Sequence, residues 1–84
     1  MAHYTVIKSD AQIYIDGIAP AADCDMSGLP SDLHALQWDE SNGHIEYTDV
    51  LKLNLPITSV EEIETHLGVS LSTLIERRTA ALEA

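Results

Sequence analysis

The sequence predicts an α+β fold in one small domain, and two observations indicate this class. Apolar and polar residues alternate with period two over much of residues 1–57, which is typical of strands buried on one face. Residues 58–84 change to the three-to-four-residue spacing of amphipathic helices. We therefore expect residues 1–84 to form a single domain, with a small antiparallel sheet of about four or five strands followed by two short helices.

The clearest strand signal is a central hairpin over residues 34–48. On each side of a Ser-Asn-Gly sequence at 41–43, two apolar residues alternate with polar ones. Asn and Gly tolerate the positive φ angles of tight hairpin turns, so the turn is expected there. Trp38 and Tyr47 would then lie nearly opposite each other as an aromatic pair. The residues expected in the structural core are Leu36, Trp38, Ile45 and Tyr47.

Three further strands and a loop are predicted around this hairpin. Residues 3–7 and 12–15 are rich in β-branched and aromatic side chains, which favour strands. Leucines alternate with polar residues over 51–55, and this strand should end at Pro56, because proline has no amide hydrogen for a ladder. Residues 20–30 are poor in large apolar side chains and are expected to form a loop.

The first predicted helix has signals at both ends. Ser59 is followed three residues later by Glu62, which is the pattern of a capping box. Gly68 is placed to end the helix in the left-handed conformation. The apolar residues that fall on one face are Val60, Ile63 and Leu67.

The second predicted helix can be capped by Ser70 and carries an apolar stripe. A helix of this kind often meets another chain, so its stripe and one arginine are the candidate interface. An alternative for Arg77 and Arg78 is interaction with the C-terminal half of the helix and with Glu76 or Glu83. The candidate interface residues are Leu71, Leu74, Ile75, Arg78 and Leu82.

The charge balance restricts the class of partner. Four Lys and Arg residues stand against 14 Asp and Glu residues, which gives a formal net charge of −10. This balance argues against binding to nucleic acid or to an anionic membrane surface, both of which require clustered basic residues. No apolar run reaches the roughly 18 residues of a membrane-spanning helix. The acidity favours either simple solubility or a partner with a basic surface.

The residues that could perform chemistry do not form a recognisable set. The histidines lack the i, i+4 spacing and the Cys-x-x-Cys partners of metal sites. Cys24 lies between two aspartates, which disfavour a reactive thiolate, and Ser27 lacks the Gly-x-Ser-x-Gly setting of hydrolase nucleophiles. We therefore expect no enzymatic activity, no metal and no cofactor. The four histidines are His3, His34, His44 and His66.

One long segment resembles a known group of proteins. Residues 25–39 read DMSGLPSDLHALQWD, and residues 43–47 read GHIEY. Together with the Ile-Asp-Gly sequence at 15–17, they resemble small proteins encoded by tailed bacteriophages and prophages, in which two N-terminal strands precede a D-x-S-G-L-P…H-A-L-Q-W…G-x-I-E-Y pattern. The resemblance covers about residues 4–49. It does not extend to the helical end.

The resemblance implies a setting among tail and tail-fibre genes and no known catalytic site. We therefore expect a non-enzymatic tail, tail-fibre or baseplate component, or an assembly protein, that acts through its C-terminal helix or a sheet edge. Its partners would be phage tail or tail-fibre proteins or a second copy of the chain, in the virion tail or in the host cytoplasm during assembly. The alternative hypothesis, based on the net charge of −10, is a small acidic phage inhibitor that binds a basic surface of a host defence or regulatory protein.

Overall fold

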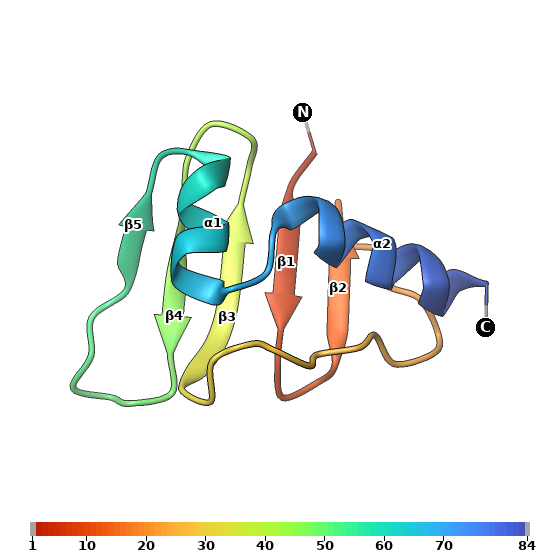
Figure 1. Cartoon of the computed structure of the whole chain (residues 1–84), viewed down its shortest axis with the longest axis horizontal. Helices are drawn as coiled ribbons and strands as arrows, with labels where there is room; N and C mark the ends of the chain where they lie inside the picture. The colour runs from red at the N-terminus through yellow and green to blue at the C-terminus, as the bar shows by residue number, and fades with distance from the viewer. Residues whose placement is uncertain (1, 84) are drawn as a thin grey trace.

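A computed structural model, which describes residues 2–83, shows a five-stranded sheet with two helices on one face (Figure 1). The α+β arrangement predicted from the sequence is confirmed, while the ends of the predicted domain, Met1 and Ala84, lie outside the described residues. The elements are β1 (Tyr4–Ile7), β2 (Gln12–Ile15), β3 (Leu33–Trp38), β4 (Gly43–Tyr47), β5 (Leu55–Ile57), α1 (Val60–Leu67) and α2 (Leu71–Leu82).

The strand order is β2-β1-β3-β4-β5, and every neighbouring pair is antiparallel. A row of aligned aliphatic residues crosses the whole sheet at its middle. It consists of Ile13, Val6, Leu36, Ile45 and Leu55, one from each strand. The first four are almost fully buried, because this face of the sheet lies under the helices.

The helices complete the core from above. Ile63 and Leu67 of α1 and Leu74 of α2 are almost inaccessible to solvent. In Figure 1, α1 crosses the β3–β4 side of the sheet, while α2 covers β1 and β2 and extends past the sheet edge. The loop between β2 and β3 runs along the same side and contributes Cys24, which is buried.

The opposite face of the sheet is open to solvent across the described residues, and its side chains are largely polar. Thr5, Gln37 and His44 are aligned across β1, β3 and β4. Thr5 Oγ1 donates to Gln37 Oε1 at 2.8 Å, and a ring nitrogen of His3 lies 2.8 Å from the same oxygen. His44 Nε2 lies 2.8 Å from Glu46 Oε2. Antiparallel sheets commonly have one packed face and one hydrated face in this way.

The β3–β4 turn differs from the prediction. The positive φ angle of 81° is at Glu40, not at Asn42 or Gly43. Asp39 Oδ1 accepts hydrogen bonds from the backbone amides of Ser41 at 3.1 Å and Asn42 at 2.9 Å, and these two bonds shape the loop. The same bonds, that from Asn42 first, hold the pKa of Asp39 below its ordinary value.

The predicted aromatic pair of the hairpin is also wrong. Trp38 is aligned with Gly43 on β4 and with Tyr4 on β1, while Tyr47 is aligned with Leu33 at the other end of β3. Gly43 is required because a Cβ atom there would collide with the backbone of β3. The glycine that suggested a turn therefore serves close approach of two strands.

The final strand lies later than predicted. The sequence predicted a strand over 51–55 that ends at Pro56, but β5 spans Leu55–Ile57 and includes the proline. Because β5 is an edge strand, Pro56 can lack an amide hydrogen without breaking the ladder to β4. Leu51 and Leu53 alternate with polar residues as noted, yet they lie in a loop and are each 88% exposed.

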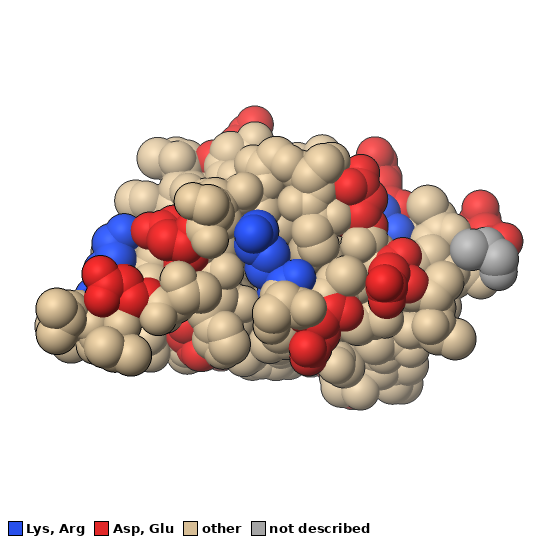
Figure 2. Space-filling view, turned by 90° about the horizontal axis from the view of Figure 1, so that it is seen from below, with Lys and Arg blue, Asp and Glu red and all other residues tan. Residues whose placement is uncertain are grey.

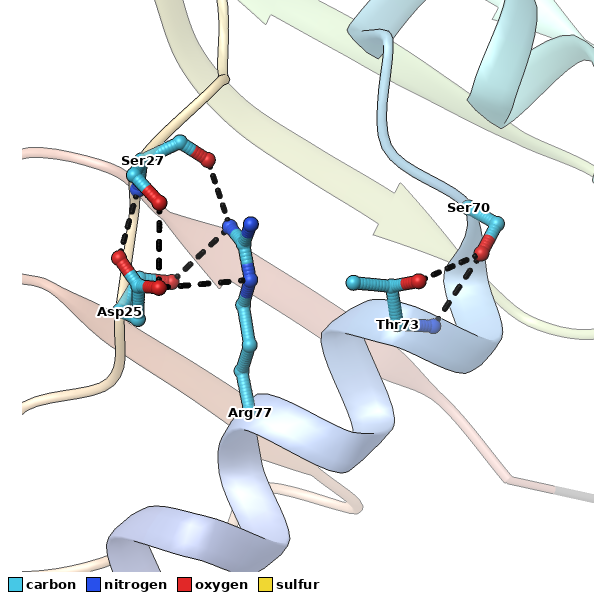
Figure 3. Close-up of polar contacts among 5 residues, drawn as sticks. All are labelled: Asp25, Ser27, Ser70, Thr73 and Arg77. Atoms are coloured by element: carbon cyan, nitrogen blue, oxygen red, sulfur yellow. Dashed lines mark hydrogen bonds and ion pairs between the residues drawn. The ribbon is translucent and has the colours of Figure 1, made fainter.

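The predicted starts of both helices and the predicted end of α1 are confirmed. Ser59 and Gly68 flank α1, and Gly68 has the left-handed φ of 75°. The Ser59 side chain donates to the Glu62 carboxylate at 3.4 Å and does not accept from the helix backbone, so the capping box is formed only in part. Ser70 Oγ accepts from the Thr73 amide at 3.2 Å and caps α2 (Figure 3).

Candidate protein-binding surfaces

The β2 edge of the sheet is closed by the chain's own groups. An exposed strand edge provides unpaired N–H and C=O groups to which another chain can add. Here backbone groups that face outward from β2, and from the residues just before and after it, form hydrogen bonds within the chain. Strand addition at this edge is therefore disfavoured. The bonds are Cys24 N–H to the Ala11 carbonyl at 2.7 Å, Arg78 Nε to the Ile13 carbonyl at 3.2 Å, and a reciprocal pair between Ile15 and Ile18 at 3.0 Å.

Two arginines attach α2 to the rest of the molecule. Arg78 also donates from Nη2 to the Ile18 carbonyl at 2.9 Å. Arg77 Nη1 donates to the Ser27 carbonyl at 2.7 Å and to the Asp25 carbonyl at 3.2 Å (Figure 3). Its Nε lies 3.8 Å from Asp25 Oδ2. These charge-assisted bonds join segments that are far apart in the sequence.

The alternative predicted for these arginines, contact with Glu76 or Glu83, does not occur among the described residues. The hydrogen bonds of Arg77 and Arg78 go to backbone carbonyls of the β2–β3 loop and of β2 with its following turn. No local sequence pattern predicts which carbonyl an arginine will bind, because a backbone carbonyl is present at every position.

The five predicted interface residues of α2 are divided by the structure. Leu74 is fully buried in the core, and Arg78 is bonded to β2, so neither is available to a partner. Leu71 and Ile75 are half-buried, and Leu82 is 53% exposed near the helix end. Only the last three lie where another protein could reach them.

Leu71 and Ile75 lie in a groove between the two helices, which we name the helical groove. Its volume is about 370 Å³. Each helix contributes the residues at i, i+1 and i+4 of its first turns, so the groove runs between the N-terminal halves of α1 and α2. It is lined by Val60, Glu61, Glu64, Ser70, Leu71, Ser72 and Ile75.

A second groove lies on the other side of α2, against the β2–β3 loop, with a volume of about 390 Å³. Its rim is polar, and the Asp25 carboxylate in that rim already accepts hydrogen bonds from the chain itself. The Ser27 amide donates to Asp25 Oδ1 at 2.9 Å, and this bond is the first cause, with Arg77 a lesser one, of the lowered pKa of Asp25. The lining residues are Asp23, Asp25, Thr73, Glu76, Arg77, Ala80 and Ala81.

The loop between β4 and β5 is the most exposed apolar segment. Its three large aliphatic side chains are 88–96% exposed, and we name them the apolar loop. The left end of Figure 2, where Figure 1 places this loop, is a projection of tan atoms beside acidic and basic ones. The apolar loop consists of Val50, Leu51 and Leu53.

The lysine within this loop turns towards the body of the protein. Lys52 Nζ lies 2.7 Å from Asp32 Oδ2 and 4.0 Å from the centroid of the Tyr47 ring. The bond from Lys52 lowers the pKa of Asp32, and Asp32 in turn raises the pKa of Lys52. Lys52 therefore anchors the loop while its apolar neighbours extend into solvent.

Within residues 2–83, no three His, Cys, Asp or Glu side chains are grouped in a way that could hold a metal ion. His3 and His44 lie on the open sheet face with Gln37 and Glu46 as their partners. None of the described helices combines the length and apolar character needed to cross a membrane.

The residues that carry the phage resemblance are mainly architectural. Gly28 has a positive φ of 81° in the turn before β3, and Leu33, Ala35 and Trp38 of β3 are buried. Gly43 permits the close approach of β4 described above. No protein-family model, curated protein or solved structure matches this chain.

Proposed function

We propose that this chain is a non-enzymatic protein of a tailed bacteriophage that acts by binding other proteins in the tail or during tail assembly. The observation that carries the proposal is the apolar loop. Burying one large aliphatic side chain contributes about 1.5–3 kcal/mol, so leaving three in solvent on one loop has a cost unless another surface covers them. Clustered exposed apolar side chains typically mark protein-binding sites.

The motif at residues 25–47 supports the tail setting of this proposal. Its residues build the turn and the hairpin, and the chain leaves that hairpin directly into the apolar loop. The resemblance therefore concerns the scaffold, and the proposed contact surface lies at the point where the resemblance ends.

Mass spectrometry of purified particles of the parent phage, with the infected-cell lysate as the control, tests the setting. A copy number that is a multiple of three or six would support a place in the tail or its fibres, given the symmetry of such assemblies. Detection in the lysate alone would overturn the structural role and leave assembly as the remaining form of the proposal.

A loop variant tests the surface. Replacing Val50, Leu51 and Leu53 together by Ser should abolish co-purification with tail proteins while leaving the fold intact. Replacing the exposed Ile18 by Ser provides a control, because it also removes an exposed apolar side chain, 66% accessible, but one that follows β2 at the other edge of the sheet. Equal loss in both variants would contradict a specific role of the apolar loop.

A second candidate function is the small acidic phage inhibitor of a basic host protein. The net charge of −10 favours it, and Figure 2 shows acidic residues spread across the visible face. Such binding would weaken steeply with added salt, because exposed ion pairs are screened. Association with a tail protein that is insensitive to salt would favour the first proposal instead.

A further inference from the structure

We infer that the helical groove binds an amphipathic helix of a partner protein, one whose apolar face is flanked by Lys or Arg. This inference rests on the proposed protein-binding function and specifies the chemistry of one partner. It concerns a surface separate from the apolar loop.

The floor of the groove is apolar and accessible. Val60 is 43% exposed, and Leu71 and Ile75 are half-buried, so all three retain surface that a partner can cover. Val60 belongs to α1 and the other two belong to α2, so an occupant would contact both helices. A third helix can pack into the groove between two others through side chains spaced at i, i+3 or i+4, and i+7.

The length of α1 limits the occupant. With eight residues and a rise of about 1.5 Å per residue, α1 extends for about 12 Å. A partner helix therefore needs only about two turns to match the groove.

The rim of the groove is acidic. Glu61 and Glu64 are exposed, no basic residue is among the lining residues, and neither side chain forms an ion pair with another described residue. The N-termini of the two helices oppose this charge with about half a positive unit each. Two full carboxylates outweigh that contribution at the rim of α1, where Glu61 lies in the first turn.

None of the chain's own Lys or Arg side chains lines this groove. Arg77 and Arg78 are bonded to carbonyls beside β2 and its loop, and Lys52 is bonded to Asp32. A second copy that presented its helical layer would bring carboxylates against carboxylates. The charge complement of the groove is therefore a basic partner and not this chain itself.

The probe is a synthetic amphipathic helical peptide with Leu along one face and Lys beside it, compared with the same peptide carrying Glu in place of Lys. Binding to the full chain is followed by amide chemical shifts. The Lys peptide should shift the amides of Val60, Glu64, Leu71 and Ile75, and the Glu peptide should not. Shifts concentrated at the groove beside Asp23 and Arg77, or the absence of binding, would overturn the inference.

Two double variants with the same change in net charge separate groove binding from general attraction. Glu61→Gln with Glu64→Gln should weaken binding of the Lys peptide by about 3- to 10-fold, as expected for two exposed ion pairs. Glu76→Gln with Glu83→Gln, outside the groove, should change it by about twofold or less. Equal weakening by the two double variants would overturn the inference.

The outcomes of this experiment are independent of the particle experiment. A chain found in phage particles whose groove binds neither peptide would retain the proposed function and lose this inference. A chain whose groove binds the Lys peptide but that is absent from particles and from tail complexes would retain this inference and lose the proposed function.

Discussion

The two ends of the sheet are completed in different ways. At the β2 end, outward backbone groups are bonded to the β2–β3 loop, to Arg78 and to the following turn. At the β5 end, a three-residue strand with a central proline leads back to a loop with three exposed aliphatic side chains. The comparison indicates that contact with another protein would bury more apolar surface at the β5 end.

The polar side chains that hold neighbouring segments against the two ends of the sheet also differ in how firmly they bind. Two guanidinium groups hold α2 against backbone carbonyls near β2, with the Arg77 side chain only 17% exposed. Lys52 and Asp32 near β5 are 49% and 43% exposed, and exposed ion pairs of that kind stabilise a fold little because water and salt screen them. The β5 end is therefore held less firmly than the β2 end.

The largest effect is expected at the centre of the sheet, which the two ends share. Trp38→Ala should lower the free energy of unfolding by about 3–5 kcal/mol, because Trp38 is 3% exposed in the core. Urea unfolding measures the change. Tyr14→Ala, on the open face of β2, is the control and should cost much less. A Trp38→Ala variant as stable as the control would contradict the assignment of Trp38 to the core.

The second effect concerns the β2 end. Arg78→Met retains the alkyl stem and removes both carbonyl contacts, which should cost about 1.5–3 kcal/mol. Amide hydrogen exchange should then accelerate in β2 and not in β5. Lys52→Met is the matched change at the β5 end and should cost clearly less than Arg78→Met, because the exposed Lys52–Asp32 pair is screened by solvent. A larger loss of stability from Lys52→Met than from Arg78→Met would contradict the firmer attachment of the β2 end.

The third effect is a pH dependence present at both ends. The pKa values of Asp25 and Asp32 are lowered in the folded chain, by the Ser27 amide and by Lys52 respectively. Their contribution to stability is therefore complete above the unfolded value of about 3.9 and is lost as pH falls through the lowered values.

A carboxyl carbon titration by NMR measures both pKa values. Lys52→Gln should return the pKa of Asp32 towards its ordinary value and leave that of Asp25 unchanged, because Lys52 contacts only the former. Movement of both midpoints, or of neither, would show that the two ends are not electrostatically separate.

The smallest effect on stability is expected at the apolar loop. The triple replacement of Val50, Leu51 and Leu53 by Ser should change the free energy of unfolding by less than about 0.5 kcal/mol, because these side chains make little contact with the rest of the chain. Urea unfolding of the isolated chain is sufficient for this test. A loss of several kcal/mol would mean that the loop packs against the protein in solution.

Features with local causes could be predicted from the sequence. The two ends of α1 and the start of α2 follow from Ser59, Gly68 and Ser70, which flank these helix ends in the sequence. Leu36 and Ile45 could be assigned to the core because strand alternation determines which face a residue occupies.

Features with distant causes could not. Arg78 reaches the Ile13 carbonyl across 65 residues of sequence, and no side-chain pattern marks that partner. Leu51 and Leu53 alternate as strand residues do, but pairing, which no single segment contains, determines whether alternation becomes a strand. The helical groove could not be predicted because Val60 and Ile75 belong to different helices, and only the packing of α1 beside α2 makes them neighbours.

The position of Lys52 also gives a way to map contacts by limited proteolysis. The chain has four Lys and Arg residues, so trypsin has few sites, and Lys52 is the one that adjoins the apolar loop. Cleavage after Lys52 requires release of its ammonium group from Asp32 and Tyr47. Lys8 is the comparison site, because it lies in the β1–β2 turn near the other end of the sheet. A partner that protects the bond after Lys52 while cleavage after Lys8 continues would be located at the β5 end without any substitution in the chain.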